Sequence, residues 1–248
     1  MVNRQIDGMG ELQSAFSLLF KNWILAIPPA IVALAAGIYF AVIVAGMVGG
    51  ILAAGAMGTT PNFGALFGGG GLLILLGVLV ILLLSVLALA IVIGAAERVW
   101  HGQPADLAGG ISKALSKLPS LILLFIIFGI IGIIPFIGWL VDLVLAFFWF
   151  YAMPGIVLGN LGTTQAMSAS WKLASANAGP TITALLGIIV VNIIGGIINV
   201  VCVHIPILGL IVSFVVGGLT SAYAALVIVR FYDLVAGSSA SAPPSSTT

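Results

Sequence analysis

Charged side chains are scarce in this chain: Asp, Glu, Lys and Arg make up only 5% of its 248 residues, while hydrophobic residues make up 62%. Average soluble domains contain about 25% charged residues. The chain therefore has too few ions to cover the surface of a water-soluble globule. The net charge of +1 also lacks the basic field needed to attract phosphate, which excludes nucleic acid as a partner. We expect hydrocarbon to surround most of the chain, with the lipid bilayer as its main partner.

Cysteine and catalytic motifs are scarce as well. The single Cys202 excludes an internal disulfide and any metal site built from several cysteines. The sequence contains no HExxH, no phosphate-binding Walker loop and no Gly-x-Ser-x-Gly motif. The glycine tract at 68–71 is followed by an apolar run rather than by Lys and Ser or Thr. We therefore expect a non-enzymatic protein without a cofactor or a bound metal.

Long apolar runs are what the chain has in abundance. Six of them lie at about 23–48, 72–96, 119–135, 138–158, 181–203 and 207–231. Roughly 20 helical residues cross a bilayer core of about 30 Å, and continuous apolarity favours helices over the alternating strands of a β-barrel. The sequence predicts an all-α, polytopic integral membrane bundle of six spans over residues 1–236. The tail 237–248, rich in Ser, Pro and Thr, is predicted to be disordered.

The connections between the predicted spans differ in length. Residues 134–138 and 205–209 both contain Ile, Pro and a final Gly. They predict two tight hairpins, because Pro stops a helix and Gly permits a sharp bend. The connection from about Gly49 to Gly71 is longer and carries no charge, so we expect it to dip into the membrane interface.

Positive charge is predicted to lie on a single side of the membrane. In the six-span arrangement that side holds all seven basic residues, which are Arg4, Lys21, Arg98, Lys113, Lys117, Lys172 and Arg230. Cytoplasmic loops of membrane proteins carry an excess of Lys and Arg. The pattern predicts a multi-pass protein of the cell membrane, the inner membrane of a bacterium, with both termini in the cytoplasm.

Polar segments with helical periodicity precede the three predicted hairpins, at residues 11–23, 106–118 and 163–178. Each is predicted to be an amphipathic helix at the membrane interface, here called an elbow helix. Phe16, Ile111 and Met167 correspond when the segments are aligned, which predicts three repeats of an elbow helix followed by a transmembrane hairpin. The alternative is that amphipathic linkers align by chance. The predicted interfacial residues are Phe16, Lys21, Trp23, Ile111, Lys117, Met167, Trp171 and Lys172.

Four polar residues lie within or beside the apolar runs. Asp142 lies well inside a span, where a charge costs about 2.5–3.5 kcal/mol, and His204 lies beside an outer turn. We hypothesise that these two residues pair near the outer leaflet; the alternative is that Asp142 is hydrated or capped near the interface. Asn192 and Asn199 lie seven residues apart on one helical face. They either hold helices together by hydrogen bonds or line a polar path.

One segment resembles a known family. Residues 152–177, AMPGIVLGNLGTTQAMSASWKLASAN, are similar to part of the six-span domain of some bacterial glycerophosphoryl diester phosphodiesterases and of related stand-alone membrane proteins of unknown function. The matching positions are Pro154, Ile156, Val157, Gly162, Ala166 and Ser170. The resemblance covers about residues 105–235 and implies a six-span fold. An acidic residue often follows the Ile-Val step in that group, whereas Gly159 and Asn160 stand here, and no phosphodiesterase activity is implied.

Together these features favour a non-enzymatic membrane protein of unknown molecular role that organises lipid or a partner protein at the cytoplasmic face. The alternative is a transporter or channel for a small or amphipathic, lipid-like solute. A second copy of the chain or a partner membrane protein is a further candidate partner.

Overall fold

The computed structural model describes residues 6–59, 63–132, 138–202 and 204–240. The chain is all-α, with 88% of it helical and no strand among those residues, which confirms the predicted fold class. The elements are α1 (Gly8–Lys21), the short 3₁₀ turn η1 (Trp23–Ala26), α2 (Ile27–Ala56), α3 (Phe63–Trp100), α4 (Leu107–Ser116), α5 (Leu118–Gly132), α6 (Gly138–Phe148), α7 (Ala152–Val157), α8 (Thr163–Ala176), α9 (Ala178–Cys202) and α10 (Pro206–Ala240).

Among the described residues, four helical segments are long and apolar enough to cross a membrane: Trp23–Ala56, Gly71–Trp100, Ala178–Cys202 and Gly209–Gly237. A fifth is reached if α4 and residues Leu118–Ile130 of α5, which meet at a bend of 72°, form one span. The apolar helices therefore make this a membrane-embedded protein. At 1.5 Å per residue, α5 and α6 reach only about 22 Å and about 16 Å, so the two middle spans of the predicted six are shorter than a bilayer core.

The predicted span 138–158 is interrupted, because turns at 149–151 separate α6 from α7. Ser170 of α8 fills this break: its Oγ accepts the Tyr151 N–H at 2.9 Å and donates to the Phe148 carbonyl at 2.8 Å. Tyr151 Oη lies 3.0 Å from Thr181 Oγ1, and Thr181 donates in turn to the Asn177 carbonyl. Backbone N–H and C=O groups that are shielded from water need a hydrogen-bond partner within the protein. Here Ser170 of α8, a helix later in the chain, is that partner for the backbone at the break.

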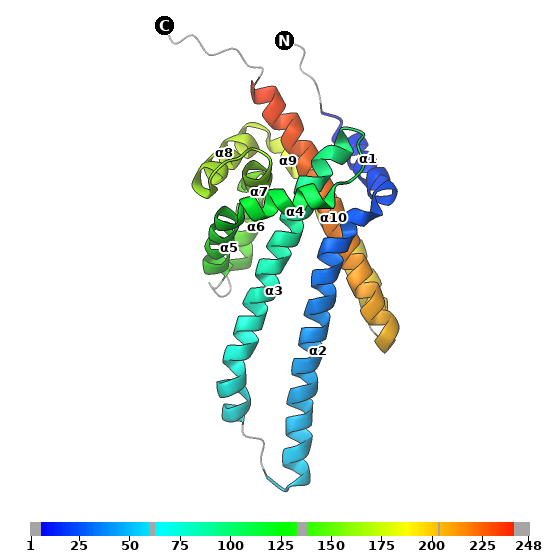
Figure 1. The fold of residues 1–248 in the computed structure, drawn as a ribbon, viewed down its shortest axis with the longest axis vertical. Coiled ribbons are helices and arrows are strands. Elements are labelled where there is room, and N and C mark those ends of the chain that lie inside the picture. Colours follow the sequence, from blue (N-terminus) through cyan, green and yellow to red (C-terminus); the bar gives the residue numbers. More distant parts are fainter. Residues whose placement is uncertain (1–5, 60–62, 133–137, 203, 241–248) are drawn as a thin grey trace.

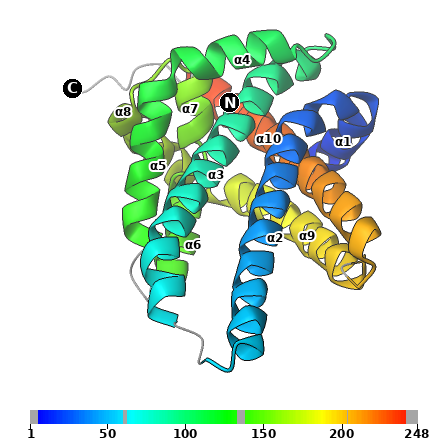
Figure 2. The same cartoon turned by 60° about the horizontal axis from the view of Figure 1, so that its bottom comes forward.

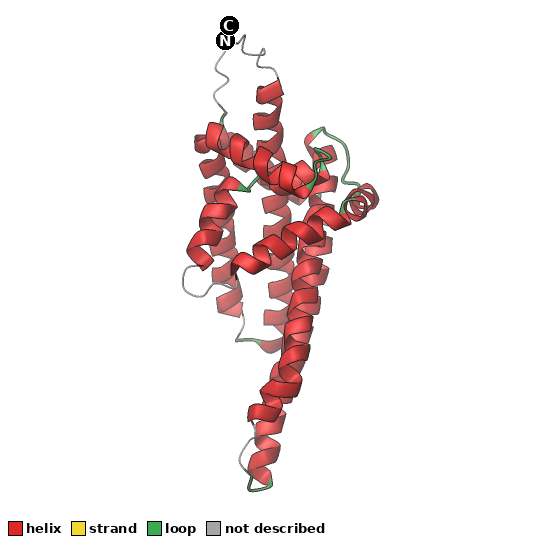
Figure 3. Cartoon of the chain, turned by 90° about the vertical axis from the view of Figure 1, so that its left-hand side faces the viewer, coloured by secondary structure: helices red, strands yellow, loops and turns green. Residues whose placement is uncertain are grey.

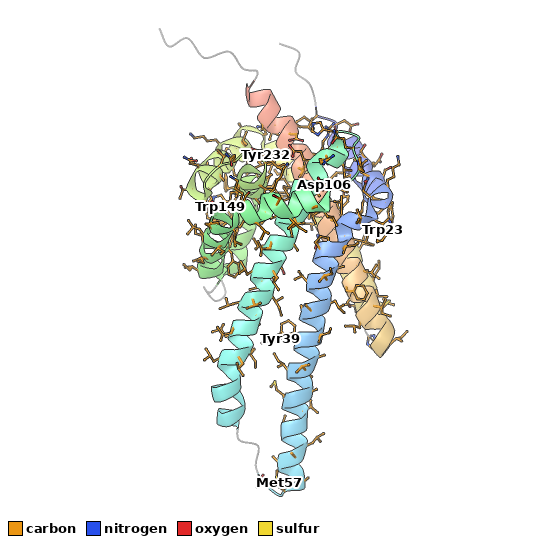
Figure 4. All side chains as sticks on the ribbon, viewed as in Figure 1. Trp23, Tyr39, Met57, Asp106, Trp149 and Tyr232 are labelled. Carbon is orange, nitrogen blue, oxygen red and sulfur yellow. The ribbon has the colours of Figure 1, made fainter. Side chains whose placement is uncertain are left out.

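The α2–α3 hairpin is longer than its sequence predicts. The connection expected over 49–71 is helical on both sides of residues 57–62, because α2 continues to Ala56 and α3 begins at Phe63. Glycine is tolerated in membrane helices because no water is present there to form hydrogen bonds with the backbone, so the backbone N–H and C=O groups bond within the helix. The Tyr39 hydroxyl of α2 donates to the Leu73 and Ile74 carbonyls of α3, and its ring lies over Gly77. The two long helices are thus joined near the middle of α2, at Tyr39 (Figure 4), and in the first third of α3.

The hairpins diverge from one end of the molecule, here called the elbow end, where α1, α4 and α8 lie (Figures 1 and 2). The α2–α3 hairpin reaches well beyond the other helices (Figure 3). α10 packs against α1, α2, α3 and α9, and its last turns return to the elbow end. It continues through Gly237 to Ala240, and the rest of the predicted tail, 241–248, lies outside the described residues.

The tightly packed core also lies at the elbow end. Its largest fully buried side chains include Leu25, Ile93, Tyr151, Leu226 and Phe231. Farther along α2, α3 and α9, large aliphatic side chains are exposed on most faces. Such a surface is stable where hydrocarbon replaces water, since lipid tails are as apolar as the side chains themselves.

Replacing Ser170 with Ala should destabilise the protein, because the Tyr151 N–H and the Phe148 carbonyl would lose their partner in a buried place. Each buried unsatisfied group costs about 1–3 kcal/mol. Ser168→Ala, at an exposed position of the same helix, is the matched control and should be neutral. Thermal unfolding in detergent micelles measures both variants; equal midpoints would contradict the assigned role of Ser170.

Two glycine-to-alanine substitutions in the α9–α10 hairpin should change the stability of the protein in opposite directions. A Cβ on Gly218 of α10 would lie 2.6 Å from the Ala26 carbonyl oxygen and 2.8 Å from Ala30 Cβ, whereas a Cβ on Gly196 of α9 would meet open space. Gly218→Ala should therefore lower the unfolding midpoint, while Gly196→Ala should raise it, since Ala is favoured over Gly in a helix by roughly 0.5–1 kcal/mol. A Gly218→Ala variant as stable as Gly196→Ala would contradict the close crossing of α2 and α10.

Candidate functional site

Two of the three elbow helices, α1 and α4, begin with the same kind of cap. Asp7 and Asp106 accept the N–H groups of Gly10 and Gly109 at the starts of α1 and α4, which is the standard acid cap. The Gly109 N–H and then the Arg98 guanidinium lower the pKa of the Asp106 carboxyl, so this cap stays ionised. An acid also suits the positive end of the helix dipole.

α1 and α8 agree further at their C-terminal ends. Each has 14 residues and is followed by an asparagine with nearly the same dihedral angles, φ −125° and ψ 46° at Asn22 and φ −125° and ψ 47° at Asn177. The side-chain amide of each asparagine donates to the carbonyl four residues earlier, at 3.1 Å and 3.0 Å. At the end of α4, Lys117 takes φ −108° and ψ 9°. α1 and α8 thus turn into the following helices through the same local geometry, and α4 does so through a different one.

Burial follows one pattern in all three elbows. Over 15–22, 110–117 and 170–177 the eight residues read buried, exposed, exposed, half-buried, and then the same four again. The buried positions carry small or branched side chains, as in Leu19, Ala114 and Ala174. A stripe of this period is one face of an amphipathic helix, so each elbow packs one face on the bundle and leaves the other free.

The free faces present large apolar side chains. Phe16, Ile111 and Trp171 lie at the same distance from the helix end and are 46%, 43% and 48% exposed. Met167, which the sequence alignment matched to Phe16 and Ile111, lies one turn before Trp171 and is half-buried against the core; the repeat alignment itself stays a prediction. Trp23, which follows α1, is 64% exposed and points away from the bundle (Figure 4).

Ion pairs gather at the elbow end. Glu11 of α1 accepts two hydrogen bonds from Arg230 of α10, at 2.7 Å and 2.9 Å. Ion pairs also join Arg98 to Asp106 and Lys113 to Glu97. The Lys117 ammonium contacts the side-chain oxygen of Asn160, which ties α4 to the turn after α7.

Two predicted interfacial lysines have no such partner. Within the part of the chain that the structure describes, Lys21 and Lys172 make no ion pair or side-chain hydrogen bond, and both are exposed. Each lies on the free face of its elbow, beside Trp23 and Trp171 respectively in sequence. Both positive charges are therefore available to an anion in the surroundings.

A groove of about 640 Å³ lies between α1, α9 and α10, within the usual size range of small-molecule pockets, about 300–1,000 Å³. Its walls are mostly apolar and include Leu12 and Phe16 of α1 and Leu186 and Val190 of α9. The polar residues Gln13, Ser17 and Thr183 also line it. The groove thus combines hydrocarbon walls with a polar margin at the elbow end.

A smaller and more polar cavity, of about 340 Å³, lies deeper between α2, α3, α9 and α10. Its lining includes Ser85, Thr220, Ser221 and the predicted Asn192. Thr220 is about 15 Å along α10 from Arg230 at 1.5 Å per residue, so the cavity lies well inside the apolar part of the bundle. Ser85, Asn192 and Thr220 donate hydrogen bonds to carbonyls of their own helices.

The remaining predicted polar residues are dispersed. Asn199 is half-buried, and its Oδ1 has no hydrogen-bond partner among the described residues. His204 is exposed on the turn between α9 and α10. Asp142 lies on α6, but its side chain lies outside the described part of the structure, so its pairing with His204 stays a prediction.

No group of three or more His, Cys, Asp or Glu residues that could hold a metal ion occurs among the described residues. Comparisons with protein-family models, curated proteins and solved structures found no match to this chain. The functional argument therefore depends on the elbow faces, the groove and the cavity themselves.

Proposed function

We propose that this is a non-enzymatic membrane protein that organises phospholipid at one membrane face through its elbow helices. The observation that carries the proposal is the free face of each elbow, which combines exposed large apolar residues with, in α1 and α8, an unpaired lysine. Amphipathic helices that place aromatic residues toward acyl chains and lysines toward headgroups bind in the interface plane. Anionic lipids attract such lysines at the cytoplasmic surface.

The same proposal includes three membrane-inserted hairpins, α2–α3, α5–α6 and α9–α10, giving the six-span arrangement expected from the sequence. The short α5–α6 hairpin returns to the elbow end whether it crosses the whole bilayer or only one leaflet. An even number of crossings then leaves both termini on the elbow side. The basic residues at that end support its assignment to the cytoplasm, and we place the protein in the inner membrane of a bacterium.

We further propose that the chain consists of three repeats of elbow helix and hairpin. The support is the shared burial pattern of the three elbows and the matching ends of α1 and α8. The second repeat has the shorter elbow, of 10 residues, and the shorter hairpin. The resemblance to the membrane domain of glycerophosphoryl diester phosphodiesterases is part of this proposal as an expectation about the fold.

A second candidate function is transport of an amphipathic, lipid-like solute. The deep cavity that contains Ser85, Asn192, Thr220 and Ser221 favours it, because a headgroup moving between leaflets needs polar side chains at mid-depth. The long apolar surface of α2, α3 and α9 supplies a track for acyl chains. A second copy of the chain or a partner membrane protein remains a candidate occupant of that surface.

Lipid organisation is tested with spin-labelled phospholipids in vesicles that contain the purified protein. We expect a motionally restricted fraction that is larger for phosphatidylglycerol than for phosphatidylcholine, since the free lysines attract an anionic headgroup. The difference should shrink from 0.01 M to 1 M salt, over which the Debye length falls from about 30 Å to about 3 Å. Equal fractions for the two lipids at low salt would contradict the proposal.

The same vesicles distinguish lipid transport from lipid organisation. Dithionite bleaches fluorescent lipid in the outer leaflet alone, so bleaching beyond half of the signal reports lipid movement between leaflets. Movement that is faster than in protein-free vesicles and slowed by Asn192→Leu would favour the transporter. Movement equal to that of protein-free vesicles would leave lipid organisation as the better account.

A further inference from the structure

We propose that the deep cavity between α2, α3, α9 and α10 is a binding site for a neutral lipid with a free hydroxyl group, of the diacylglycerol class. This inference is independent of the lipid-organising role of the elbow helices, and it names the class of solute that the second candidate function would handle. It follows from the depth of the cavity, from the uncharged residues that line it and from the hydrogen-bonding capacity that those residues keep.

Small residues on α2 and α10 leave the space that the cavity occupies. Ala33 and Ala36 of α2 and Gly217 of α10 line it, and a Cβ on Gly217 would lie 3.5 Å from the Ala33 Cβ. α10 also packs against α3 and α9, which bring Ser85 and Asn192 to the same cavity. The site is therefore formed by four helices packed around α10 rather than by one flexible side chain.

The cavity lies at the depth of the hydrocarbon core. Ser85 is about 18 Å along α3 from Glu97, and Asn192 is about 21 Å along α9 from Ala178, at 1.5 Å per residue. Since a bilayer core is about 30 Å thick, both side chains lie near its middle. A charged group is costly at this depth, so a lipid with an ionised headgroup is held at the surface while an uncharged lipid can reach the cavity.

The described residues that line the cavity are all uncharged, and the polar ones among them are Ser85, Asn192, Thr220 and Ser221. None of these side chains can neutralise a phosphate or an ammonium group. Removing an ion from water without an opposite charge beside it is strongly unfavourable. The lining therefore selects a polar group that carries no charge.

The free hydrogen-bonding capacity of the cavity is mostly that of an acceptor. Ser85 and Thr220 donate their hydroxyl hydrogens to the Ile81 and Gly217 carbonyls, so their oxygens are left to accept from a ligand. Asn192 donates one N–H to its own helix at 2.9 Å, and its amide oxygen has no hydrogen-bond partner within the described chain. A ligand that donates a hydroxyl hydrogen matches this set.

Diacylglycerol meets these conditions, because it has one hydroxyl group to donate, ester carbonyls to accept and no charge. The second Asn192 N–H and the Ser221 hydroxyl, both free of partners among the described residues, are donors for those carbonyls. The cavity, of about 340 Å³, accommodates a glycerol unit but not two long acyl chains. Ser85 and Asn192 are exposed, so the cavity is open there and the chains leave along the apolar surfaces of α3 and α9.

The test uses phosphatidylcholine vesicles that contain the full-length protein and one of two neutral lipids, each spin-labelled on an acyl chain. One is a diacylglycerol, and the other is the matching diester of 1,2-propanediol, which has a methyl group in place of the hydroxymethyl group. The unmodified protein should bind the diacylglycerol about threefold to tenfold more tightly, as expected for about one hydrogen bond inside a membrane. Asn192→Leu should remove this preference, and Ser85→Ala, also at an exposed position, should reduce it and serves if Asn192→Leu does not fold, as judged by thermal unfolding.

Asn199→Leu is the matched control, since it makes the same change on α9 outside the lining of the cavity; it should leave the preference intact. Equal binding of the two diesters by the unmodified protein, or loss of the preference in Asn199→Leu to the same extent as in Asn192→Leu, would overturn the site. In either case selective restriction of phosphatidylglycerol would still support the role of the elbows. Loss of that selectivity with the diacylglycerol preference intact would refute the elbow proposal and leave this site standing.

Discussion

Hydrocarbon offers no hydrogen bonds to a polypeptide, and this constraint explains most of what the structure does with its few polar groups. The ion pairs of Glu11, Glu97 and Asp106 lie at the elbow end, where they join α1 and the segment 106–116 to the ends of the long helices α3 and α10. Deeper hydroxyls, such as those of Ser85 and Thr220, bond carbonyls of their own helices. Between α6 and α7, where the helix is interrupted, Ser170 of α8 forms hydrogen bonds with the Phe148 carbonyl and the Tyr151 N–H.

The elbow helices make the molecule asymmetric, because all three lie at one end of it. Each buries a narrow stripe against the bundle and leaves apolar and polar side chains facing outward in a fixed order. α1 packs along the first turns of α9, where Leu12 approaches Gly187, and the two helices with α10 enclose the apolar groove.

Apolar length and periodicity were enough to predict the helical class, the positions of the short helices α1, α4 and α8, and four of the long helices. The break at 149–151 could not be predicted, because Ser170 reads as an ordinary polar residue until the fold brings it to Phe148 and Tyr151. The glycine-rich stretch before Leu72 was assigned to a loop by composition, although helix continues through it to Phe63. Trp171, rather than Met167, matches Phe16 because the match is set at the helix end, where Asn22 and Asn177 adopt the same geometry.

Cysteine accessibility tests most directly whether the elbow end and the far tip of α2–α3 lie on opposite sides of a membrane. In a Cys202→Ser background, single cysteines replace Gln103, in the exposed turn after α3, and Thr59, in the exposed turn after α2. An impermeant maleimide applied to intact cells with a permeable outer envelope should label the cysteine at 59, and should label that at 103 only after the inner membrane is opened. Labelling of both from the same side, or the reverse order, would contradict the account.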